Sequence, residues 1–194
     1  GTRGYGKTTA AREAAALSPR QSLSLTVPQG PHAAGHLWDI LCAQLVSQGF
    51  EAATELQRVG FPEDAPRMRR VLDFCIAYPD PILLVIDDYQ FASSPALDTF
   101  LEATVRARMP ELRMLLLSRE RPLLPLEELR IKGLAEHLDQ SLLAFPEEET
   151  RDFFRRNGEH DETAPSYAWR RREAWAGALS LCFRNRLAGR ALPP

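Results

Sequence analysis

The chain has 194 residues, a hydrophobic content of 44% and a formal net charge of −2, values typical of a globular domain of ordinary size. So small a net charge gives no electrostatic argument for binding nucleic acid or an anionic membrane. The longest apolar run, PILLVI, is far shorter than the roughly 20 residues that span a bilayer. The 3 cysteines lack the spacing of a disulfide frame or a metal site, which indicates reduced thiols in a cytoplasmic protein.

The first ten residues, GTRGYGKTTA, match the pattern G-x-x-x-x-G-K-[ST] of a phosphate-binding loop. Glycine backbone approaches phosphate closely, and the helix that follows adds the positive end of its dipole. In this interpretation Lys7 bridges the β- and γ-phosphates of a nucleotide, and the Thr8 hydroxyl binds Mg²⁺. The residues expected to hold the nucleotide are Gly1, Gly4, Tyr5, Gly6, Lys7, Thr8 and Thr9.

Helix and strand patterns alternate after this loop. The Ala-rich stretch KTTAAREAAAL predicts a helix that ends at Ser18–Pro19, and SLSLTV predicts a strand over 22–27. The segment HLWDILCAQLVSQ predicts an amphipathic helix. A further helix is expected near 66–78, with these side chains facing a core: Met68, Val71, Leu72, Cys75 and Ile76.

The clearest strand pattern is PILLVIDDYQ, an apolar run that ends on Asp87 and Asp88. A continuous apolar run is typical of a parallel strand covered on both faces. Ser94–Pro95 predicts the start of the next helix. The stretch LRMLLLSR predicts a second buried strand, which ends on Ser118–Arg119.

Weaker patterns fill the rest of the chain. We expect a short helix at 124–133, a strand at 137–145, and a helix that begins at Pro146 and stops at Gly158. From about 164 onward the pattern is helical. The sequence therefore predicts an α/β P-loop domain over 1–158, with a parallel sheet flanked by helices. Its first strand is expected to be missing by truncation, and a helical segment is expected over 159–194.

Acidic and basic residues follow the two predicted strands at the edge where ligands of parallel sheets gather. Asp87 is placed to hold Mg²⁺, and Asp88 to orient or deprotonate an attacking water. Arg119 is placed to reach a γ-phosphate or to stabilise charge that develops during hydrolysis. A strand that merely ends on acids is the alternative, but it explains the phosphate-loop pattern upstream poorly.

Several stretches together resemble a known family. GYGKTT, LLVIDDYQF, LRMLLLSRERPLLPLEELRIKG, LLAFPEEETRDFF and AWAGALSL follow one another as in the nucleotide-binding domain of the large ATP-dependent LuxR/MalT-type transcriptional regulators. These regulators belong to the STAND class of signal-transduction NTPases. The resemblance matches Trp175 and Gly177 to an element G-W-x-x-G-L, with Ala174 and Ala178 in place of its first Gly and its Leu. Gln90 stands where the family often has His.

The resemblance implies an ATP-dependent switch, at most a slow ATPase, with ATP and Mg²⁺ as cofactors. It assigns Lys7 and Thr8 to phosphate and Mg²⁺, Asp87 to Mg²⁺, Asp88 to hydrolysis and Arg119 to sensing the γ-phosphate. It also implies self-association of the parent protein and DNA binding only through a C-terminal domain outside this chain. No membrane partner is expected.

Two alternatives remain open at this point. A P-loop enzyme of another class, such as a small-molecule kinase, would need an arginine-rich lid, for which ERP after Arg119 is too little. A remnant that binds no nucleotide and serves as an interaction module is favoured modestly by the missing first strand, since the loop then lacks its support.

Overall fold

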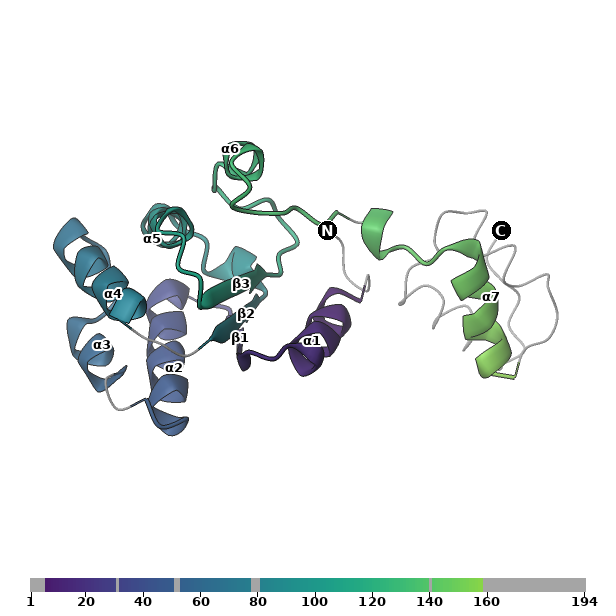
Figure 1. The fold of residues 1–194 in the computed structure, drawn as a ribbon, viewed down its shortest axis with the longest axis horizontal. Coiled ribbons are helices and arrows are strands. Elements are labelled where there is room, and N and C mark those ends of the chain that lie inside the picture. The colour runs from purple at the N-terminus through teal and green to yellow at the C-terminus, as the bar shows by residue number, and fades with distance from the viewer. Residues whose placement is uncertain (1–5, 31, 51–52, 78–80, 140, 159–194) are drawn as a thin grey trace. The chain divides into compact units, whose positions relative to one another are not determined.

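The computed structural model describes residues 6–30, 32–50, 53–77, 81–139 and 141–158 (Figure 1). The chain divides into two compact units, Thr8–His137 and a second that contains Gly1–Lys7 and Leu138–Pro194. The helical segment expected over 159–194, with Trp175 and Gly177, lies outside the described residues. The predicted domain boundary at 158 therefore stays a prediction.

The unit Thr8–His137 is built on a parallel sheet of three strands in the order β1-β2-β3. The strands are β1 (Gln21–Thr26), β2 (Ile82–Asp87) and β3 (Leu112–Leu116). This arrangement confirms the predicted α/β fold with a parallel sheet flanked by helices. The helices of this part of the chain are α1 (Lys7–Leu17), α2 (Ala33–Ser47), α3 (Ala53–Val59), α4 (Ala65–Ala77), α5 (Pro95–Arg106) and α6 (Leu126–Ile131), with a 3₁₀ turn, η1 (Tyr89–Phe91).

Strand β2 is buried on both faces, as its continuous apolar run predicted. Successive side chains of a strand point to opposite faces. Leu84 and Ile86 join a large core cluster with residues of α2, α3, α4 and α5. Leu83 and Val85 pack on the other face with Ala11 of α1. Helix α1 therefore covers one face of the sheet. Helices α2, α3, α4 and α5 cover the opposite face (Figure 1).

An arginine ties the amino ends of the outer strands together. The guanidinium of Arg20, just before β1, donates hydrogen bonds to the carbonyl oxygens of Glu111 at 2.8 Å and Pro110 at 3.3 Å, just before β3. Between them, the N–H of Ile82 donates to the carbonyl of Glu111 at 2.8 Å. The start of all three strands is thus set by contacts between residues far apart in sequence.

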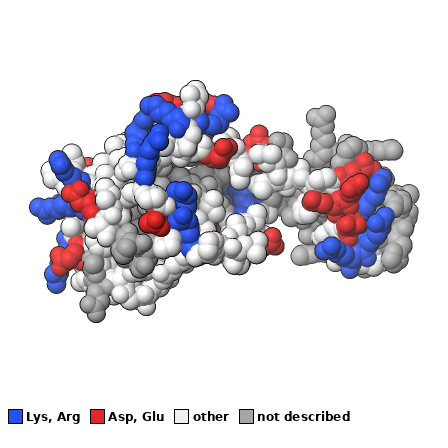
Figure 2. Space-filling view, viewed as in Figure 1, with Lys and Arg blue, Asp and Glu red and all other residues white. Residues whose placement is uncertain are grey.

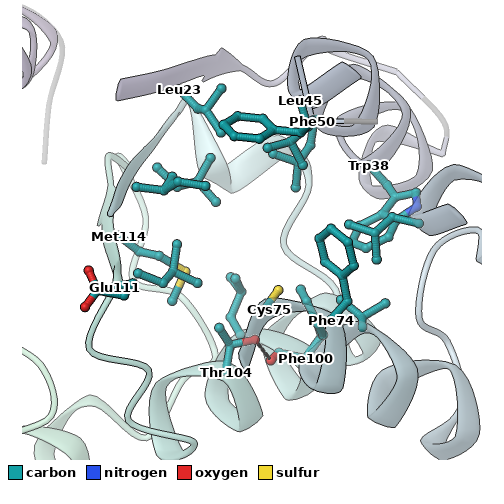
Figure 3. Close-up of a pocket in the computed structure, with 17 residues that line it drawn as sticks. Leu23, Trp38, Leu45, Phe50, Phe74, Cys75, Phe100, Thr104, Glu111 and Met114 are labelled. Atoms are coloured by element: carbon teal, nitrogen blue, oxygen red, sulfur yellow. Dashed lines mark hydrogen bonds between the residues drawn. The ribbon is translucent and has the colours of Figure 1, made fainter. Parts of the chain in front are cut away.

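A small apolar cavity of about 90 Å³, partly open to the surface, lies between the sheet and the helices α2, α4 and α5 (Figure 3). Trp38 forms part of its wall and packs edge-on against Phe100, with ring centroids 6.0 Å apart. Leu23 of β1 and Cys75 of α4 line it as well. Side chains that line this apolar space lack contacts that a filled core would give them.

We expect Leu23→Ala to lower the free energy of unfolding by about 2–5 kcal/mol, because it removes buried contacts and enlarges the cavity. Leu23 is 1% exposed. The measurement is urea unfolding followed by circular dichroism.

The matched control is Leu17→Ala, since Leu17 is 85% exposed at the end of α1. Its change should stay within about 0.5 kcal/mol. Equal losses in the two variants would contradict the packing described for β1.

Two expectations from the sequence are wrong. Ile76 was expected to face the core with the rest of its stripe on α4, but it is 63% exposed. The strand expected at 137–145 is not formed by its described residues, which instead contain a 3₁₀ turn, η2 (Ser141–Leu143). Leu142, within it, is 66% exposed and its N–H donates to the Asp139 carboxylate at 3.4 Å, so a turn replaces strand pairing.

The predicted helix ends are largely confirmed. Ser94 caps α5, accepting a hydrogen bond from the Leu97 N–H at 3.3 Å, with Pro95 at the first position. Helix α7 (Glu147–Arg156) begins one residue after Pro146, and Gly158 follows its end with a φ of 84°. That left-handed φ is the conformation for which glycine is favoured at a helix C-terminus. Helix α3 was missed because only a short apolar stripe marks its 7 residues.

Acidic and basic side chains lie side by side over α5 and α6 (Figure 2). Arg106 of α5 pairs with Glu102 and Glu128, and Glu127 pairs with Arg130. The hydrogen bond from Arg130 lowers the pKa of the Glu127 carboxyl. Opposite charges therefore neutralise one another locally on α5 and α6.

The described cysteines are free, as the sequence predicted: Cys42 is buried and Cys75 is half-buried. Burial, with a smaller contribution from Asp39, raises the pKa of the Cys42 thiol to about 11. Burial also raises the pKa of Cys75 to about 11. Both side chains therefore stay protonated at neutral pH. The third cysteine, Cys182, lies outside the described residues.

We expect a Cys182→Ser chain to react slowly with Ellman's reagent, and its rate to rise about tenfold per pH unit from pH 7 toward 11, because the thiolate is the reacting species. At pH 8 the thiolate fraction of such a thiol is about 0.1%, against about a quarter for an ordinary cysteine. The same chain in guanidinium chloride is the control. A folded-state rate that levels off near pH 8.5 would contradict the burial of these thiols.

Candidate nucleotide site

The carboxyl ends of the strands meet at one edge of the sheet. Beyond the strands, the N–H of Val27 donates to the carbonyl of Asp87 at 3.0 Å, and the N–H of Tyr89 donates to the carbonyl of Leu117 at 3.0 Å. These bonds continue the pairing past the last residues of β1, β2 and β3. The residues that follow each strand are therefore held together, at the edge where parallel sheets bind ligands.

Thr8 and Asp87 are in direct contact. The Thr8 hydroxyl donates a hydrogen bond to Oδ2 of Asp87 at 2.7 Å, although the two residues are 79 apart in sequence. Thr8 lies in the first turn of α1, and Asp87 is the last residue of β2. Packing of α1 on the sheet through Ala11 brings the two side chains together. Both supply hard oxygen atoms of the kind that Mg²⁺ prefers.

Asp88 has an uncommon backbone conformation, with φ 55° and ψ 37°. Aspartate adopts this left-handed region more readily than most residues, because its short side chain forms local hydrogen bonds. The Asp88 N–H donates to Oδ1 of Asp87 at 2.8 Å, so both oxygens of Asp87 are engaged. Such conformations persist where the surrounding contacts determine them, and they concentrate at functional sites.

Arg119 forms an ion pair with Asp88. Its Nη2 lies 3.1 Å from Oδ1 of Asp88, and the two side chains are 32% and 30% exposed. Arg119 follows β3 and Asp88 follows β2, so the ion pair links adjacent strand ends. Half-burial leaves this pair in contact with solvent, where an arriving anionic group competes with the carboxylate for the guanidinium.

Gln90 bridges the same two strand ends. Its Nε2 donates to Oδ1 of Asp88 at 2.9 Å. Its Oε1 accepts from the N–H of Arg119 at 3.0 Å and from the Ser118 hydroxyl at 3.3 Å. The sequence pointed to Gln90 only as a departure from a family pattern. The available signal was that polar residues follow both β2 and β3, namely Gln90 and Ser118. Whether such residues meet depends on the strand register, which the sequence does not show.

A buried polar network holds the turn that follows Asp88. The hydroxyl of Tyr89 donates to Oδ1 of Asp98 at 2.7 Å, and the Ser93 hydroxyl donates to Oδ2 at 2.9 Å. Tyr89 is completely buried and Asp98 is 4% exposed. Burial, together with the hydrogen bond to Asp98, raises the pKa of the Tyr89 phenol. No local sequence pattern marks these residues, because their contacts join a turn to a buried position on α5.

We expect Tyr89→Phe to lower the free energy of unfolding by about 1–3 kcal/mol, because it removes a hydrogen bond from the buried Asp98 carboxylate. A double-mutant cycle with Ser93→Ala, measured by chemical unfolding, should show coupling between the two changes, since both hydroxyls serve one carboxylate. A Tyr89→Phe chain as stable as the parent would contradict this network.

The structure brings together four of the residues predicted for the site: Thr8, Asp87, Asp88 and Arg119. Gly6 has a φ of 76°, which favours glycine, directly before α1. Lys7 is the first residue of α1, and Thr9 is exposed in its first turn. Gly1, Gly4 and Tyr5 lie outside the described residues. Among the residues described, no cluster of three or more His, Cys, Asp or Glu side chains has the arrangement of a metal site.

Comparison with known proteins gives a partial similarity to a transcriptional regulator. The chain is 33% identical over 78 residues to the HTH-type transcriptional regulator MalT of Cronobacter sakazakii (strain ATCC BAA-894). The match covers 40% of this chain and 9% of MalT, so the chain corresponds to a small part of that relative. No family model matches. The similarity supports a relation to transcriptional regulators of the MalT type.

None of the helices in the described ranges combines the length and apolar character needed to cross a bilayer.

Proposed function

We propose that this chain is the ATP-binding switch domain of a transcriptional regulator of the MalT type, and at most a slow ATPase. The observation that carries the proposal is the hydrogen bond between Thr8 and Asp87. It joins the threonine of the phosphate-loop pattern to the acid at the end of the central strand. A chance match to the loop pattern would give no reason for this contact.

The residues present fit Mg²⁺, because the Thr8 hydroxyl and the Asp87 carboxylate offer adjacent oxygen ligands. In the proposed site these two residues hold the ion, and when bound it neutralises charge on the β- and γ-phosphates. Gly6 and the loop before it, with Lys7 and Thr9, bind the phosphates through backbone N–H groups and the lysine ammonium.

The remaining charged residues act on the γ-phosphate side of the proposed site. Asp88 orients or deprotonates the attacking water, and Arg119 binds the γ-phosphate oxygens. The ion pair between them supports this assignment, since it places a guanidinium and a carboxylate within 3.1 Å of each other after neighbouring strands. Arg119 would bind a γ-phosphate in place of Asp88, and the Asp88 carboxylate would then be available to a water.

The similarity to MalT supports a role in transcriptional regulation. MalT is named as an HTH-type transcriptional regulator, and the similarity covers 9% of it. We assign DNA binding to another part of the regulator, because acidic and basic side chains neutralise one another on α5 and α6. ATP and ADP are the partners of this domain, and the nucleotide state controls self-association of the whole protein.

We expect Mg²⁺–ATP to stabilise the chain against heat, by about 2.7 kcal/mol at 100 times Kd, because ligand binds only the folded state. Lys7→Ala should abolish the shift, and Thr8→Val should abolish its dependence on Mg²⁺. The measurement is thermal unfolding with ATP or ADP, with and without Mg²⁺.

The matched controls are Lys132→Ala and Thr99→Val. Lys132 is exposed directly after α6, and Thr99 is exposed on α5. Both should retain the full shift. A parent chain that shows no shift with either nucleotide would contradict the proposal and favour an interaction module without nucleotide. A phosphorylated small-molecule product would instead favour an enzyme of another class.

A further inference from the structure

We propose that Gln90 is a positioning residue of the nucleotide site, which sets the separation between the Asp88 carboxylate and the backbone at Ser118–Arg119. The proposal rests on the proposed function and deepens it. Gln90 would determine how well the site distinguishes a nucleotide that carries a γ-phosphate from one that does not.

The hydrogen bonds of Gln90 use both ends of its carboxamide. The amide nitrogen donates to Oδ1 of Asp88 at 2.9 Å, and the amide oxygen accepts from the Arg119 N–H at 3.0 Å. Chemistry determines this orientation, because a carboxylate requires a donor and a backbone N–H requires an acceptor. A flipped amide would lose both bonds.

The same carboxylate oxygen also faces the guanidinium of Arg119, 3.1 Å away. Asp88 Oδ1 therefore accepts hydrogen bonds from both the Gln90 amide and the Arg119 guanidinium. Meanwhile Gln90 holds the backbone from which the Arg119 side chain extends. The three residues form a closed loop of contacts, in which Gln90 fixes the Arg119 backbone relative to the carboxylate that the Arg119 side chain binds.

Gln90 is itself held in place. It lies in η1, directly after Tyr89, whose hydroxyl is bonded to the buried Asp98. The carbonyl of Tyr89 accepts hydrogen bonds from the N–H groups of Ala92 and Ser93, at 2.9 and 3.0 Å. A bridging side chain on such an anchored turn loses little additional freedom when it bonds, so it can define a distance between two strand ends.

Two substitutions of similar size separate the two ends of the amide. Gln90→Met removes both the donor and the acceptor. Gln90→Glu keeps an acceptor for the Arg119 N–H but places a negative charge against Asp88. The matched control is Gln48→Met, because Gln48 is exposed and its Oε1 accepts a side-chain hydrogen bond from Gln21 at 2.7 Å, away from this site.

The first readout needs no nucleotide. Amide hydrogen exchange of Arg119, followed by NMR on the full chain, should accelerate about five- to tenfold in Gln90→Met, as expected for loss of one hydrogen bond. Exchange should stay near the parent rate in Gln90→Glu and in Gln48→Met. An unchanged Arg119 amide in Gln90→Met would overturn the proposal.

The second readout is the affinity for Mg²⁺–ATP and Mg²⁺–ADP by calorimetry. Both Gln90 variants should weaken ATP binding about tenfold and leave ADP binding within about twofold of the parent, since only ATP reaches Asp88 and Arg119. Equal weakening of ATP and ADP would show a merely structural role and overturn the proposal. A parent chain that binds neither nucleotide would refute the proposed function. The exchange measurement would still decide whether Gln90 holds the backbone at Arg119.

Discussion

The candidate site depends on the parallel pairing of β2 with a strand on either side. Pairing in the same direction places the carboxyl end of each strand at one edge of the sheet, and hydrogen bonds such as Tyr89 N–H to Leu117 carbonyl extend it past the strands. Because β2 carries apolar side chains on both faces, helices cover it on both sides. One of them, α1, thereby brings Thr8 to the edge where Asp87 lies.

The polar residues at this edge form a connected set, in which each contact supports the next. Asp87 receives the Thr8 hydroxyl on one oxygen and the Asp88 N–H on the other. The left-handed backbone at Asp88 turns its carboxylate to Gln90 and Arg119. The turn is anchored by a hydrogen bond from the Tyr89 hydroxyl to the buried Asp98 carboxylate. An uncommon backbone conformation is stable here because contacts on both sides determine it.

The similarity to MalT and the geometry of the site are two separate observations. The similarity concerns sequence over 40% of the chain and does not depend on the contacts between strands. The geometry concerns contacts such as the one between Thr8 and Asp87, which no pairwise identity reports. In the proposed switch, a phosphate replaces the Asp88 carboxylate at Arg119, and the half-buried ion pair of these two residues has the charge and the solvent contact for such an exchange.

The amino-acid sequence by itself determined the features that are local in the chain. These are the phosphate-loop pattern, the apolar run of β2, the cap at Ser94 and the acids that end the central strand, because each depends on neighbouring residues. Only the tertiary structure decided the contacts between distant segments. Examples are the hydrogen bond from Arg20 to the Glu111 carbonyl and the hydrogen bonds that join Gln90 to Asp88 and Arg119. The same dependence explains the errors at 137–145 and Ile76, since burial and strand pairing require a neighbour that local pattern does not supply.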